Sequence, residues 1–386
     1  MKLKVVPILM AFFAMGVADA MGPMSNTVKE NYELSNVMAT MLPFFVFIAF
    51  AVFSVPGGLL AARIGMKKLL LLGLGLNMVA MLIPCLITPS FPLLVACIFV
   101  LGVGTTFLQV AGNPIMRDVS AGGMYGRNLS FAQGFKGIGS TASAYLVSIA
   151  ATIAFLAKLE WRAAFPIFCG LMAIVFVWVM TLKIEEQKAE IPPSIGSSLG
   201  LLKKPVFALA VLGIFLYVGA EVCIATFSGR LLEQTGMSAT SAAKYGAPLF
   251  LAMLTVGRLT GGVVLNFINP RNFFRISAAL GLVGGIILML GNSSIAVVGV
   301  LLAGLGFANI WPMLFSITVE EDPKRSGELS GLMCMAISGG AIVPLIMGKA
   351  VDNGMGVKAF IVPVICFAYL LVLSLKGGSK KVESAE

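Results

Sequence analysis

The chain has 386 residues, of which 59% are hydrophobic and 11% are charged, and its mean hydropathy is +0.99. A soluble domain of this length has no way to bury so much apolar surface. The composition therefore excludes a soluble globular protein and predicts an all-α membrane protein. The net charge of +10 would suit nucleic acid, but most lysines and arginines stand in short loops beside apolar segments. We expect a lipid bilayer as partner and no nucleic acid.

Stretches of about 20 mostly apolar residues, long enough to cross a bilayer as a helix, recur along the whole chain. We predict twelve transmembrane helices, at residues 5–26, 38–62, 68–88, 91–116, 128–156, 163–183, 206–229, 240–267, 272–291, 293–319, 327–351 and 356–376. The first stretch is too long for a signal peptide and lacks a small-residue cleavage site. We expect it to be a retained helix.

The positive charges predict how the chain is oriented. If successive spans alternate in direction, most basic residues, among them Arg63, Arg117 and Lys203, lie on one side, whereas the opposite loops carry few, such as Lys158. Positive charge marks the cytoplasmic side. We therefore predict a multi-pass protein of a bacterial-type plasma (inner) membrane, with both termini in the cytoplasm.

Neither metal nor cofactor chemistry is indicated. The chain has no histidine, and its six cysteines lie singly inside predicted spans, where they act as small apolar residues. No metal site and no cofactor are expected, and any proton transfer must use carboxylates.

The sequence repeats itself at an offset of about 200 residues, which predicts two pseudo-symmetric six-helix halves. Phe13 to Asp19 matches Phe215 to Glu221, and Gly139 matches Gly339. We place the halves at residues 1–183 and 205–386, joined by a cytoplasmic linker at 184–204. Parallel repeats of this kind place the substrate site between the halves, so Asp19 and Glu221 should face one cavity.

Three ionisable residues lie deep inside apolar stretches: Asp19, Glu221 and Lys136. A charge in hydrocarbon costs at least a few kcal/mol, so each is a candidate functional residue. We expect Asp19 and Glu221 to serve proton coupling, with Asp19 paired to Lys136 and Glu221 carrying the proton. In the alternative, Lys136 binds a carboxylate of the substrate.

Polar and aromatic side chains inside the spans predict a binding site for a polyhydroxylated solute. Gln109 and Asn113 share one helical face, as do Gln133 and Lys136. Tyr217, Glu221, Asn309 and Trp311 complete the predicted substrate-binding set. Pro114 should free the backbone carbonyl of Val110. Taken singly, each amide could instead form a hydrogen bond between helices.

Several motifs resemble the major facilitator superfamily and, within it, the fucose:proton symporter branch. The segment 58–68 resembles the loop motif between helices two and three, and 108–114 and 217–221 resemble two signatures of the branch. Segments 257–261 and 339–344 also fit. The resemblance implies cation-coupled uptake of a small hydrophilic substrate, with gating residues Gly58, Arg63, Gly65 and Arg258.

The chain departs from the branch at functional positions. Ala62 stands where the loop motif usually has an aspartate, and Gln109 replaces the acid that the fucose transporters have on helix four. Their helix-one aspartate corresponds to a position near Gly22, a few residues after Asp19. Lys136 replaces a polar amide of the sugar cavity.

The function predicted from these features is secondary active transport. We expect a monomer that couples proton entry to uptake of a monosaccharide-like solute by alternating access through a central cavity. The alternatives are an anionic sugar acid or other small organic anion held by Lys136, and a multidrug efflux antiporter. We expect no enzymatic activity, since no nucleophile with a base is present.

Overall fold

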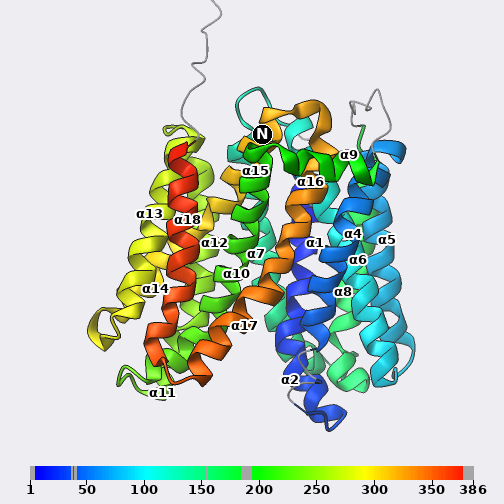
Figure 1. Ribbon diagram of the computed structural model, residues 1–386. Coiled ribbons are helices and arrows are strands. Elements are labelled where there is room, and N and C mark those ends of the chain that lie inside the picture. The colour runs from blue at the N-terminus through cyan, green and yellow to red at the C-terminus, as the bar shows by residue number, and fades with distance from the viewer. Residues whose placement is uncertain (1–4, 36–37, 39–40, 154, 184–193, 377–386) are drawn as a thin grey trace, which may run out of the picture.

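The computed structural model describes residues 5–35, 38, 41–153, 155–183 and 194–376, and its regular structure within these ranges is helical (Figure 1). The first six predicted stretches contain α1 (Val5–Met15), η1 (Gly16–Ala20), α2 (Met21–Asn31), α4 (Met41–Ile64), α5 (Met66–Leu86), α6 (Phe91–Asp118), α7 (Tyr125–Ile149) and α8 (Ala164–Met180). The last six contain α10 (Pro205–Glu233), α11 (Ala239–Tyr245), α12 (Ala247–Val264), α13 (Pro270–Met289), α14 (Ser293–Ala308), α15 (Ile310–Glu321), α16 (Ser326–Met335), η6 (Ala336–Ser338), α17 (Gly339–Asp352) and α18 (Ile361–Lys376).

All twelve predicted stretches are helical in the residues that the structure describes. Nine helices there are long and apolar enough to cross a membrane, and Val5–Ala20 and Ala164–Met180 are shorter apolar helices. The remaining span, α7, has 25 residues. The tenth span breaks between α14 and α15 at Asn309. The multi-pass helical fold predicted from hydropathy is confirmed.

The two halves repeat the same close helix contact, which confirms the pseudo-symmetry. In the first half a methyl group added at Gly139 of α7 would overlap the carbonyl oxygen of Phe13 in α1. In the second half a methyl at Gly339 would overlap the carbonyl oxygen of Phe215 in α10. Both pairs match in the sequence repeat, so glycine is needed at these positions because two backbones touch.

The hydrogen bonds that join the halves gather near one end of the bundle, which we call the closed end. α4 ends and α5 begins there, and α18 also ends there, at the top of Figure 1. Ser330 donates to the Val110 carbonyl at 2.8 Å, and Arg127 donates to Asn266 at 3.0 Å. The Val110 carbonyl is the one that Pro114 was predicted to free.

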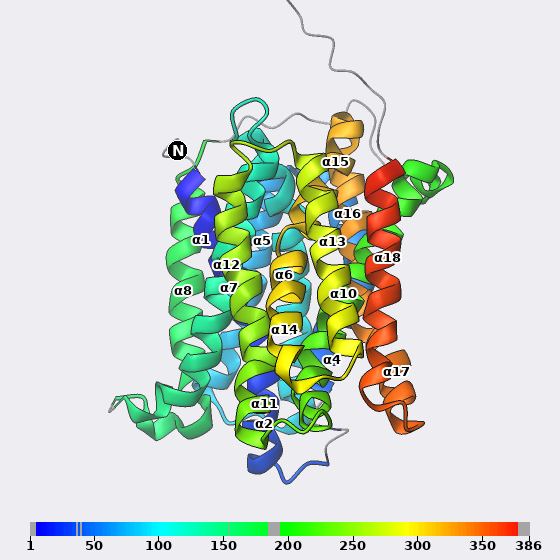
Figure 2. The ribbon, with the colours of Figure 1, turned by 90° about the vertical axis from the view of Figure 1, so that its left-hand side faces the viewer.

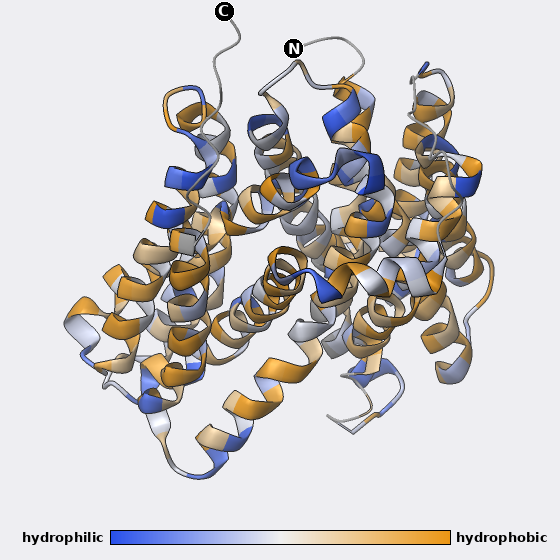
Figure 3. Cartoon of the chain, turned by 45° about the horizontal axis from the view of Figure 1, so that its top comes forward, coloured by the Kyte–Doolittle hydropathy of each residue, from blue (hydrophilic) through white to orange (hydrophobic). Residues whose placement is uncertain are grey.

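The outer surface of the bundle suits lipid. Figure 3 shows hydrophobic colouring along the helix shafts and hydrophilic colouring mainly near their ends. Large apolar side chains such as Ile174, Val177 and Leu345 are exposed. In the view of Figure 2, α8, α12, α13 and α18 run along the outside of the bundle.

Candidate functional site between the two halves

Arg258 of α12 is a buried cation, with 7% of its surface exposed. Its Nη2 donates to the Tyr217 hydroxyl at 3.1 Å and lies 3.8 Å from Glu221 Oε2. Its Nε donates to the carbonyl of Ala308 at 3.3 Å. That carbonyl is available because Pro312, four residues later, has no backbone N–H. Arg258 is therefore held by an acid, a phenol and a carbonyl.

The position of Arg258 adds to what we expected from the sequence. We expected three charges deep in the spans and assigned Arg258 to gating, which stays a prediction. Its guanidinium lies inside the bundle beside Glu221, so among the described residues Arg258 is a fourth charge within the spans. The signal was available, since Arg258 lies near the middle of the predicted span 240–267. With all four ionised, their sum is zero.

Asp19 lies in η1, midway along the first span, and its side chain is exposed. It accepts a hydrogen bond from the Ser140 hydroxyl on α7. It is also close enough to Arg258, on the other half, to interact with it electrostatically. The Asp19 carboxylate is therefore exposed and lies within electrostatic range of a cation of the opposite half. Both predicted coupling acids thus lie near Arg258, but only Glu221 pairs with it.

The expected ion pair between Asp19 and Lys136 is not formed, and Asp19 is held by Ser140 instead. Among the described residues no acid forms an ion pair with Lys136. Its ammonium lies close enough to the Cys334 thiol, on α16 of the other half, to interact electrostatically. One turn earlier, Gln133 donates to the Asn113 side-chain oxygen at 3.4 Å, and the Asn113 amide approaches Cys334 at 4.0 Å.

Two more of the predicted residues have buried polar atoms that lack a partner. Gln109 Oε1 and Trp311 Nε1 are both buried without a hydrogen-bond partner among the described residues. The Trp311 ring lies 6.4 Å from that of Tyr217 and 5.7 Å from that of Phe315. A buried polar atom without a partner costs about 1–3 kcal/mol, so a polar solute or water that pairs with these atoms is favoured.

Asn309 was predicted to bind substrate, and both ends of its amide have a partner in the protein. Its Nδ2 donates to the Gly257 carbonyl at 2.7 Å, and its Oδ1 accepts from the Ser130 hydroxyl of the other half. Asn309 therefore acts here as a contact between helices, which is the alternative left open for each amide.

The other predicted gating residues lie at the closed end. A methyl group at Gly58 would lie 2.5 Å from the Gly327 carbonyl oxygen of the other half, so α4 and α16 touch there. Gly65 joins α4 to α5 with φ +95°, a backbone conformation that favours glycine. Arg63 is exposed. The next basic residue, Lys67, donates to the Met180 and Leu182 carbonyls at 2.8 and 2.6 Å.

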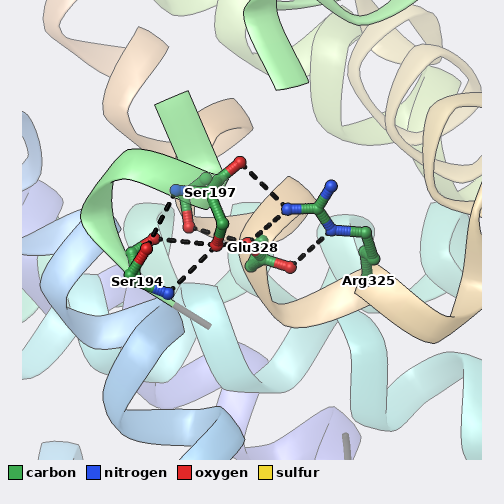
Figure 4. Close-up of polar contacts among 5 residues, drawn as sticks. Ser194, Ser197, Arg325 and Glu328 are labelled. Carbon is green, nitrogen blue, oxygen red and sulfur yellow. Dashed lines mark hydrogen bonds and ion pairs between the residues drawn. The ribbon is translucent and has the colours of Figure 1, made fainter. Parts of the chain in front are cut away.

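A polar cluster at the closed end was missed from the sequence (Figure 4). The predicted linker contains the short helix α9 (Ile195–Gly200), which packs against both α4 and α16. Glu328 of α16 accepts from Ser197 at 2.8 Å and Ser198 at 3.0 Å. Arg325 donates to Glu328 at 2.6 and 2.7 Å and to the Ser197 carbonyl at 2.9 Å. We call these four residues the linker latch; residues 184–193 of the linker lie outside the described ranges.

The chemistry available at the site is binding and charge neutralisation. In the part of the chain that the structure describes, no three His, Cys, Asp or Glu side chains group closely enough to hold a metal ion. The acids, the lysine, the amides and the indole offer donors and acceptors between two halves that are joined at one end.

Comparison with known proteins decides the family. The sequence model of the Major Facilitator Superfamily matches residues 8–344. The chain belongs to the Major Facilitator Superfamily. The superfamily consists of transporters, and the resemblance stated from the motifs is confirmed at this level.

Curated relatives and solved structures agree with this assignment. The chain is 30% identical to the glucose/galactose transporter of Brucella abortus, over 91% of this chain and 88% of that protein. It is 20% identical to the L-fucose-proton symporter of Escherichia coli, over 90% and 86%. A crystal structure of the Escherichia coli fucose:proton symporter shares the fold, with a TM-score of 0.85 at 18% identity over 98% and 99% of the two chains.

Proposed function

We propose that this protein takes up a monosaccharide-like solute together with protons. The observation that carries the proposal is an accessible carboxylate, Asp19, between two halves that also supply buried amides and an unpaired indole N–H. Amides donate and accept at once, as sugar hydroxyls require. The names of the relatives, a glucose/galactose transporter and an L-fucose-proton symporter, support the same substrate class.

Alternating access follows from the arrangement of contacts. The halves, at 1–183 and 205–386, would rock about the site, with 184–204 as their linker. Because the hydrogen bonds between halves gather near the closed end while Asp19 is exposed, we propose that this state is open toward the other end. With the closed end cytoplasmic, as the basic loops favour, the state faces outward. We propose a monomer in the plasma membrane with both termini inside.

Asp19, rather than Glu221, is the proposed proton carrier. Glu221 already has a cationic partner in Arg258, 3.8 Å away. Asp19 has a hydroxyl partner and is accessible from outside. A carrier must gain and lose its proton in each cycle, and an acid without a fixed counter-ion does this more readily.

Transport by purified protein in liposomes tests the proposal. Wild-type protein should concentrate a labelled monosaccharide when an inward proton gradient is imposed and should exchange it without one. Asp19→Asn should lose accumulation and keep exchange. Asp352→Asn, which changes an exposed acid at the end of α17, should behave as wild type.

Two outcomes would contradict the proposal. If wild-type protein transports no monosaccharide, the proposed substrate class is wrong. If Asp19→Asn still accumulates solute while Glu221→Gln exchanges it without accumulation, Glu221 is the carrier, as first expected from the sequence.

A further inference from the structure

We infer that the solute carries a carboxylate and that Lys136 binds it, so that the site takes a sugar acid such as a hexuronate. The inference rests on the proposed function and narrows its substrate class. It makes Lys136 the residue that determines specificity.

Lys136 is placed as a ligand-binding cation. It lies inside the bundle on α7, is half-buried, and forms no ion pair among the described residues. Its ammonium lies within electrostatic range of Cys334 on α16 of the opposite half. A lysine that served to fasten helices would have an acid beside it, because a charge in this environment needs a counter-ion.

The balance of charge in the transport cycle supports an anion. Glu221 and Arg258 neutralise each other. Before loading, Asp19 and Lys136 also sum to zero. When Asp19 takes up its proton, the Lys136 charge is left uncompensated, unless the solute brings one negative charge. A proton and a monocarboxylate together keep the loaded site neutral, whereas a proton and an uncharged sugar leave it at +1.

The remaining polar atoms suit the hydroxyls of the same molecule. Gln133 lies one turn before Lys136 on α7 and donates to the side-chain oxygen of Asn113. The Asn113 amide nitrogen in turn lies 4.0 Å from the Cys334 sulfur. Gln109 Oε1 can accept from a hydroxyl, and Trp311 Nε1 can donate to one, since neither atom has a partner among the described residues. These amides favour a hydroxylated acid over a plain fatty or aromatic carboxylate.

Binding of a matched pair of sugars to the purified protein tests the inference. Galacturonate and galactose differ at C6, where one has a carboxylate and the other a hydroxymethyl group. Isothermal titration calorimetry at one pH should show that wild-type protein prefers galacturonate. Lys136→Gln should weaken galacturonate binding by ~10- to 100-fold, the range for a hydrogen bond between charged groups, and leave galactose binding unchanged.

Two variants make the result specific. Lys136→Arg keeps the charge and should keep the preference for galacturonate, so it stays informative where Lys136→Gln does not fold. Lys158→Gln removes an exposed positive charge from the opposite loops and should change neither affinity.

Each contrary result has a distinct meaning. Wild-type protein that binds galactose and not galacturonate, or Lys136→Gln that weakens both equally, overturns the inference and leaves the proposed function standing. Binding of neither sugar overturns both.

Discussion

At the scale of residues, the site depends on which acid has a fixed cation. Glu221 is bound to Arg258, and Tyr217 shares the same guanidinium. Ser140, one turn after Lys136 on α7, donates to the Asp19 carboxylate of η1 and to the Lys136 backbone carbonyl at 3.1 Å. Among the described residues no ion pair joins the charged groups of Asp19 and Lys136. In the proposed function Glu221 and Arg258 form a structural pair, and Asp19 and Lys136 serve the proton and the solute.

A double-mutant cycle should reveal the coupling between Glu221 and Arg258. Removing one partner of a buried ion pair costs roughly 3–5 kcal/mol, and we expect the lower end because the Glu221 side chain is 24% exposed. Glu221→Gln and Arg258→Met should each lower the melting temperature in detergent. The double variant should lose less than the sum of the two single losses.

Glu233→Gln is the matched control, because it changes an exposed acid at the end of the same helix. It should leave the melting temperature unchanged. Strictly additive losses would show that the two side chains are not coupled.

The sequence was enough to name candidate site residues but not to predict how they pair. Asp19, Glu221 and Lys136 were found because charges inside apolar stretches are rare. Partners come from helices far apart in the chain, and side-chain direction decides among them. Lys136 was expected to reach Asp19 by helix depth alone, yet no ion pair joins the two among the described residues. We assigned Asn309 to substrate binding, but an asparagine is equally suited to a hydrogen bond between helices, and residue type alone does not separate the two roles.

At the scale of elements, the transmembrane spans were predictable from hydropathy, and the two-half repeat was predictable from the matching segments about 200 residues apart. The elements meet through glycines where backbones cross, as at Gly139 with Phe13 and at Gly339 with Phe215. Prolines inside the spans leave carbonyls for side chains of neighbouring helices: Val110 for Ser330, and Ala308 for Arg258. Only the first of these carbonyls was foreseen.

Alanine at the close crossing should destabilise the bundle. In Gly139→Ala the added methyl would overlap the Phe13 backbone, so α1 and α7 must separate, at a cost of about 1–3 kcal/mol. Gly339→Ala should cost a similar amount in the other half. Thermal unfolding in detergent measures both.

The control for this substitution is Gly170→Ala on α8, where an added methyl meets nothing within 4 Å. Its melting temperature should stay the same or rise, because alanine favours helix. Equal losses at Gly139 and Gly170 would mean that the crossing is looser than described.

At the scale of the whole molecule, the linker takes part in holding the closed end. The linker latch places two serines of α9 and one arginine around Glu328, whose side chain is 8% exposed. α9 also packs against α4 of the first half. The superfamily's loop motif usually has an acid at the position of Ala62, and this chain lacks it. The linker latch supplies a polar contact at the same end of the bundle.

Glu328→Gln should loosen α9. Hydrogen bonds to a charged acceptor are worth about 1.5–3 kcal/mol each, so losing the charge should speed amide exchange in residues 195–203 by roughly 10-fold or more. Hydrogen–deuterium exchange with mass spectrometry measures this segment directly.

Glu321→Gln provides the comparison. Its ion pair with Arg271, at 3.1 Å, lies at the same end but within one half. It should leave exchange in 195–203 as in wild type. Unchanged exchange in Glu328→Gln would show that the latch does not hold α9.

The distribution of the four intramembrane charges has an electrical consequence. Asp19 and Lys136 belong to the first half, and Glu221 and Arg258 to the second, so each half carries one positive and one negative charge. Moving a net charge through the membrane field changes the free energy by about 2.3 kcal/mol per 100 mV. In the proposed cycle each empty half would move as a neutral body, so the membrane potential should not affect the return step. The membrane potential then acts on whatever charge the proton and solute add together.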